Sequence, residues 1–135
     1  MDNLATIERS LVTEPGNKAS RALWERERAR LGLPALRWFH YRQNNSGGSF
    51  YGPENVIVQA VTAEAANERG AVLAGLYFDG VADGQDCGCC GDRWYRAWEK
   101  DEGDAFPSVY EEPTEAGEET LLVYADGWKE GGETK

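Results

Sequence analysis

The sequence lacks a long apolar stretch. Its longest uninterrupted apolar run is AVLAGLYF, residues 71–78 with one glycine counted, in a chain of 135 residues. A helix that crosses a bilayer needs about 20 apolar residues, so the sequence predicts no such helix. The opening residues MDNLATIERS also lack the basic start and apolar core of a secretory signal. We therefore expect a soluble protein that acts inside the cell.

Basic charge is scarce. The chain has 14 Lys and Arg against 24 Asp and Glu, and its net charge is −10. Residues 1–45 carry eight basic and five acidic residues, a balance of +3, whereas residues 46–135 carry six and nineteen, a balance of −13. Such a surface repels phosphate backbones, which disfavours direct nucleic-acid binding. The acidic excess either keeps the protein soluble or steers it toward a partner with a basic surface.

Cysteine and histidine are also few. The chain has three cysteines and one histidine, and all three cysteines lie in DCGCCGDRW, residues 86–94. An odd number of cysteines without a secretory signal argues against a disulfide framework. Cys87 and Cys90 have the C-x-x-C spacing that lets two thiolates reach one zinc ion, and Gly91 permits a tight turn after the second.

The cysteine segment provides only half of a zinc signature, because a structural zinc site needs four ligands. Asp86 or Asp92 are alternative donors, but the most economical set is Cys87, Cys89, Cys90 and His40. An ordinary turn that contains thiols explains the segment equally well. A redox site is disfavoured because the flanking aspartates oppose formation of the reactive thiolate.

A second candidate site lies in RQNNSGGSF, residues 42–50. This segment lacks the lysine and the following helix of a phosphate-binding P-loop. Its polar side chains and glycines suit hydrogen bonding to a small ligand or a partner, and a flexible connection between strands is the alternative. The residues predicted to bind a ligand or partner are Asn44, Asn45, Ser46, Gly47 and Gly48, together with Asp92 and Arg93.

Helix signals occur at three places. Apolar residues three and four apart predict a helix over residues 4–12. A second helix is expected over residues 18–31, with Asn17 as N-cap and a charged surface that places it on the outside of the domain. A third, over residues 62–74, begins at a threonine cap and ends before a glycine.

Strand signals have a period of two. LRWFHYRQ and ENVIVQAV, residues 36–43 and 54–61, predict two strands of a hairpin. RWYRAW, residues 93–98, predicts a further strand with its tryptophans in the core. TLLVYADGWKE, residues 120–130, predicts a strand followed by a tight turn at Asp126 and Gly127.

Residues 99–119 form an acidic segment with nine acids and one lysine. Its composition predicts a loop or a mobile insertion, with Phe106, Val109 and Tyr110 as candidate anchors. Together these signals predict an α+β fold: a small, mainly antiparallel sheet with one packed helix, preceded by two N-terminal helices. We expect a helical segment over residues 1–34 and an α+β domain over residues 35–135.

The segments NNSGGSF, YFDG and DCGCCGDRW, in this order, resemble a group of small uncharacterised proteins of tailed bacteriophages. The resemblance covers roughly residues 36–98 and transfers no catalytic residue. It implies a phage origin and a place in the cytoplasm of a bacterial host.

With that origin, we expect a non-catalytic binding protein that acts on a host or phage protein, in host takeover or counter-defence. One alternative is a small-molecule-binding protein or enzyme that uses the NNSGG loop. Another is a structural component of the virion.

Overall fold

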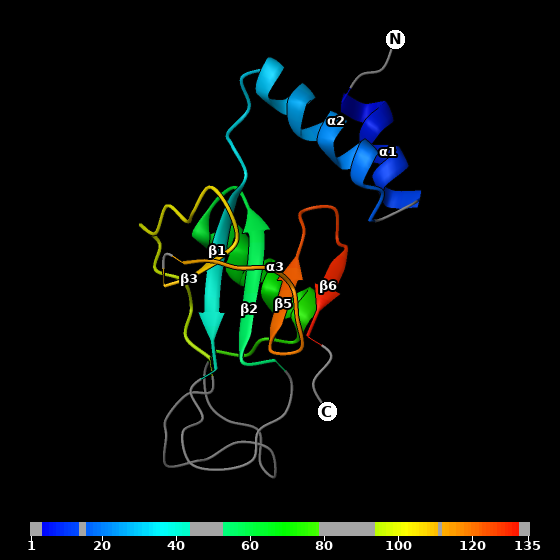
Figure 1. Cartoon of the computed structure of the whole chain (residues 1–135). Coiled ribbons are helices and arrows are strands. Elements are labelled where there is room, and N and C mark those ends of the chain that lie inside the picture. The colour runs from blue at the N-terminus through cyan, green and yellow to red at the C-terminus, as the bar shows by residue number, and fades with distance from the viewer. Residues whose placement is uncertain (1–3, 14–15, 44–52, 79–93, 111, 133–135) are drawn as a thin grey trace.

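The computed structural model describes residues 4–13, 16–43, 53–78, 94–110 and 112–132. Its fold is α+β, as the sequence predicted, with two N-terminal helices followed by a small sheet and a third helix (Figure 1). The elements in chain order are α1 (Leu4–Thr13), α2 (Lys18–Arg30), β1 (Arg37–Arg42), β2 (Asn55–Ala60), α3 (Ala63–Ala74), β3 (Ser108–Val109), β4 (Glu112–Pro113), β5 (Thr120–Val123) and β6 (Lys129–Gly131).

The ends of the helices follow local signals in the sequence. The side chain of Asn17 accepts a hydrogen bond from the Ser20 N–H at 3.1 Å and caps α2. The Thr62 hydroxyl accepts one from the Ala65 N–H at 3.1 Å and caps α3. Gly75 ends α3 with a φ of 71°, a conformation that favours glycine. All three predicted positions are confirmed.

Four strands form the main sheet in the order β1-β2-β5-β6. β1 pairs antiparallel with β2, and β5 pairs antiparallel with β6 around the predicted turn at Asp126 and Gly127. The central pair, β2 and β5, is parallel. Parallel neighbours need a long crossover, and α3 is part of that connection. The sheet is therefore mainly antiparallel, as predicted.

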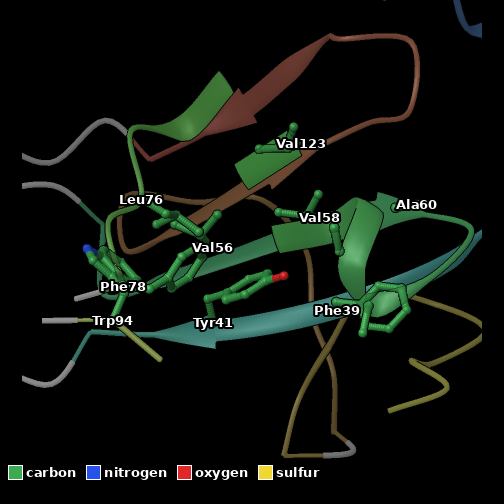
Figure 2. Close-up of a cluster of buried hydrophobic side chains, with 11 residues drawn as sticks. Phe39, Tyr41, Val56, Val58, Ala60, Leu76, Phe78, Trp94 and Val123 are labelled. Atoms are coloured by element: carbon green, nitrogen blue, oxygen red, sulfur yellow. The ribbon is translucent and has the colours of Figure 1, made fainter. Parts of the chain in front are cut away.

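The main core lies between the sheet and α3 (Figure 2). All six residues of β2 are buried, because both faces of this strand are covered. Gly70 leaves room for the side chain of Leu76, which follows α3, since an added Cβ would lie 2.7 Å from the Leu76 Cδ1. The buried residues of this cluster are Phe39, Tyr41, Val56, Val58, Ala60, Ala63, Ala66, Leu76, Phe78, Trp94 and Val123.

The described part of the acidic segment, residues 99–119, covers part of the opposite face of the sheet, and we call it the acidic cover. The backbones of Trp38 and Asp104 exchange two hydrogen bonds, of 2.9 and 2.8 Å. The buried Ser108 donates its hydroxyl to the Asp104 carboxylate at 2.6 Å. Val109 packs against a second buried cluster formed by Trp38, Ile57 and Leu122.

This cover differs from the predicted loop or mobile insertion. Its described residues include the paired strands β3 and β4. Val109 is an anchor as expected, and Tyr110, although 67% exposed, contacts His40 and Arg42 of β1. The expectation was wrong for Phe106, which is 47% exposed. The residue types alone did not reveal that Tyr110 rather than Phe106 would contact β1.

Residues 94–98 do not form the predicted strand. Asn67 of α3 binds their backbone: its Oδ1 accepts the Ala97 N–H at 2.8 Å, and its Nδ2 donates to the Ala97 carbonyl at 3.1 Å. The side-chain amide has an NH₂ donor and a carbonyl acceptor, like the backbone of a strand. It therefore forms with Ala97 the two hydrogen bonds that a neighbouring strand would otherwise form. Trp94 is buried as expected, whereas Trp98 is 67% exposed, contrary to its predicted place in the core.

The N-terminal helices lie at the end of the sheet where β1 begins and where β5 and β6 are joined (Figure 1). Ile7, Leu11 and Trp24 form a small core between α1 and α2. Leu36 and Ala125 pack against it from the rest of the chain.

A buried ion pair joins α2 to the turn between β5 and β6. The Arg21 Nε lies 3.1 Å from the Asp126 Oδ2, and the two side chains are 8% and 0% exposed. The Gly16 N–H donates to the same oxygen at 3.3 Å. The Arg21 guanidinium lies 3.8 Å from the centre of the Tyr124 ring. The charge pattern of α2 predicted a helix on the outside of the domain, but its Arg21 is buried against the turn between β5 and β6.

None of the helices within the described ranges is long and apolar enough to pass through a bilayer.

Candidate functional site

The structure describes one of the predicted site residues, His40, which lies on β1. The remaining predicted site residues lie outside the described residues: Asn44, Asn45, Ser46, Gly47, Gly48, Cys87, Cys89, Cys90, Asp92 and Arg93. The geometry of the candidate site is therefore built from His40 and from the described residues that flank these segments.

The flanks of the two predicted site segments lie at the same end of the sheet. Gln43 and Glu54 continue the ladder of β1 and β2, with the Gln43 N–H donating to the Glu54 carbonyl at 3.0 Å. Phe78 and Trp94 belong to the main core, and Figure 2 shows both rings near the end of β1. The Phe78 ring lies 5.9 Å from that of Tyr41, centre to centre. Segments far apart in the chain therefore meet at this end of the sheet.

His40 makes two contacts with other side chains. Its Nε2 lies 2.6 Å from the Asn55 Oδ1, and its ring meets that of Tyr110 edge to face, with centres 5.4 Å apart. Burial lowers the pKa of His40, although the hydrogen bond with Asn55 works in the opposite direction. The imidazole is therefore neutral at neutral pH, which is the form that binds metals.

His40 and the flanks of the cysteine segment lie on different faces of the sheet. Alternation along β1 places His40 on the face of Trp38, whereas Phe78 and Trp94 pack with Phe39 on the face of α3. β1 is an edge strand of the described sheet. A segment that passes around this edge can reach side chains on both faces of the sheet. Within the described ranges no group of three or more His, Cys, Asp or Glu side chains is placed to hold a metal.

A cluster around Tyr110 was not predicted from the sequence. Arg42 donates to the Glu54 Oε1 at 2.6 Å and to the Tyr110 hydroxyl at 3.3 Å. The Arg42 guanidinium lies 5.8 Å from the centre of the Tyr110 ring. The contacts join residues far apart in the chain, and no motif in the sequence marks them.

The acidic cover presents exposed carboxylates in two stretches of the chain, residues 99–102 and residues 112–119. Salt bridges between described residues join Arg21 to Asp126, Arg30 to Glu27 and Arg42 to Glu54, so none of them neutralises these carboxylates. The exposed acidic residues are Glu99, Asp101, Glu102, Glu112, Glu115, Glu118 and Glu119.

Residues 36–133 match a family model described as "Domain of unknown function (DUF7296)". The match begins just before β1 and includes the whole sheet and α3, whereas α1 and α2 precede it. Comparison with curated proteins and with solved structures finds no match.

Proposed function

The chain belongs to the DUF7296 family, and we propose that it is a non-catalytic, phage-encoded binding protein that acts on a host or phage protein. The observation that carries this proposal is the series of exposed carboxylates on the acidic cover. An ordered frame holds these charges: the cover is fixed to the sheet by the Trp38–Asp104 backbone pair and by Val109. A surface of this kind suits a partner with a basic face.

Electrostatic attraction would act mainly on the rate of association. Complementary charge guides the encounter and raises the association rate more than the final affinity. Basic faces of host proteins often handle nucleic acid, so competition with a phosphate backbone is the mechanism we propose for host takeover or counter-defence. The protein would act in the cytoplasm of the bacterial host.

Capture of a partner from a bacterial lysate tests this function. We expect a specific protein to be retained at low salt and lost progressively as salt rises, because ions screen exposed charges. The variant Glu115→Gln with Glu118→Gln should slow association with that protein. The variant Glu64→Gln with Glu68→Gln, which removes two exposed charges from α3 instead, should slow it less. Retention that does not depend on salt would contradict charge-guided binding.

A second candidate function is the binding or conversion of a small molecule at the NNSGG loop. The described residues that flank the loop and those that flank the cysteine segment lie at the same end of the sheet, which supports this candidate. Native mass spectrometry of protein purified from a bacterial host separates the two candidates. A bound small molecule together with no captured protein would favour the second.

We also propose one zinc ion per chain, held by Cys87, Cys89, Cys90 and His40. Thiolate and neutral imidazole are the donors that zinc prefers, and burial keeps His40 neutral. A structural zinc ion contributes to folding, so a chelator or Cys90→Ser should lower the melting temperature. Elemental analysis gives the metal content directly.

The Cys90→Ser variant is also the control for the chelator, which should have little further effect on it. His40→Ala tests the fourth ligand separately from the thiolates. Protein that contains no metal and melts at the same temperature with and without chelator would rule out the zinc site.

A further inference from the structure

Tyr110 has an unusual backbone conformation. Its φ is 50°, and among the described residues it is the one non-glycine residue with a positive φ. A side chain in this left-handed region is strained, and such strain is typical of binding sites. The ring is nevertheless 67% exposed, so burial in the core does not explain why a large side chain stands here.

The described residues on either side of Tyr110 belong to the paired strands β3 and β4. The residue follows β3, whose Ser108 is buried and whose Val109 packs on the sheet. On the other side of the turn, Glu112 pairs with Val109 and is exposed. Tyr110 thus directly follows a strand that packs on the sheet, and the exposed Glu112 lies two positions further along the chain.

The Tyr110 ring already contacts a guanidinium group of the same chain. Arg42 lies 5.8 Å from the ring centre and donates to the hydroxyl, while it also pairs with Glu54. Its side chain is 48% exposed. The Tyr110 ring, its hydroxyl and the Glu54 carboxylate therefore form an environment that binds a guanidinium, and this environment is open to solvent.

We infer that Tyr110 is the aromatic anchor of the partner-binding surface, and that the partner segment it receives carries arginine. This inference rests on the proposed function, in which the acidic cover binds a protein with a basic face. A planar guanidinium stacks on an aromatic ring and pairs with a carboxylate such as Glu112 at the same time, which the ammonium of lysine does less well. Tyrosine is also among the residues that contribute most at protein interfaces.

Binding of two peptide probes to the full chain tests this inference. The probes are an oligo-arginine and an oligo-lysine of equal length, with affinity measured by calorimetry at low salt. We expect the wild-type protein to bind oligo-arginine about three- to tenfold more tightly. Tyr110→Phe should keep this preference because it keeps the ring. Tyr110→Leu should remove the preference and leave oligo-lysine binding unchanged.

Trp98 provides a matched control. Its ring is also 67% exposed, and Lys100 lies 5.8 Å from its centre, but its φ is not positive. Trp98→Leu should leave the arginine preference intact. Loss of the preference in this variant as well as in Tyr110→Leu would mean that the preference is not specific to Tyr110, which overturns the assignment to Tyr110.

Tyr110→Gly separates binding from stability. Glycine adopts a φ of 50° without strain, so the melting temperature should stay the same or rise while the arginine preference disappears. A clear fall in melting temperature would show that the ring serves the fold, and would overturn the inference. Equal binding of both peptides by wild type and Tyr110→Leu would also overturn it, yet leave charge-guided binding standing. Wild-type protein that binds neither peptide would contradict both proposals.

Discussion

Replacing Asp126 with asparagine is expected to lower the free energy of unfolding by about 3–5 kcal/mol, because it leaves the Arg21 charge buried without its partner. The Asp126 side chain is 0% exposed, and the Arg21 Nη2 already lacks a hydrogen-bond partner. The free energy of unfolding of a folded domain is typically about 5–15 kcal/mol, so this loss is a large part of the total. Urea unfolding of both proteins measures it.

Two further variants test the cause of this effect. Replacing both partners, with Arg21→Met and Asp126→Asn together, should cost less than the sum of the two single changes, because no unpaired charge remains. Arg30→Met breaks the pair with Glu27 on the surface of α2, where the arginine side chain is 65% exposed. It should leave the free energy of unfolding nearly unchanged. A similarly small effect of Asp126→Asn would show that α2 does not dock on the turn.

Asn67→Ala is the second substitution with a large expected effect, about 2–4 kcal/mol of unfolding free energy. The Asn67 Oδ1 accepts hydrogen bonds from the Tyr41 hydroxyl at 2.7 Å and from the Ala97 N–H, and its Nδ2 donates to the Ala97 carbonyl. Alanine leaves all three groups without this partner. Urea unfolding again gives the change in free energy.

Two variants with smaller expected effects serve as references for the loss of unfolding free energy in Asn67→Ala. Tyr41→Phe removes one of the three hydrogen bonds and should cost about 1 kcal/mol. Glu68→Ala, at the next and exposed position of α3, should change the free energy by less than about 0.5 kcal/mol. If Asn67→Ala costs no more than Glu68→Ala, the amide does not hold residues 94–98 against α3.

The candidate site was predictable from the sequence only in part. The acidic charge and the unusual cysteine segment are visible in the residues themselves. The proximity of Phe78 and Trp94 to the end of β1, and the contact of Tyr110 with Arg42, depend on how distant segments pack. No local pattern encodes such contacts, because each partner has an ordinary sequence environment.

The sequence by itself determined the elements whose signals are local. Asn17 and Thr62 cap helices through backbone groups three residues away, and Gly75 ends α3 because it adopts a positive φ freely. Alternation of aromatic and polar residues marked β1, and Asp126 with Gly127 marked the last turn. These features depend on interactions between residues close in the chain.

Only the tertiary structure decided how these elements combine. It placed β5 parallel to β2, replaced a predicted strand by backbone contacts to Asn67, and buried Arg21 against Asp126. It also turned the acidic segment into a cover for the sheet and left Tyr110 exposed. The physical reason is that a polar or aromatic side chain has several favourable environments, and the long-range packing of the chain determines which of them is available.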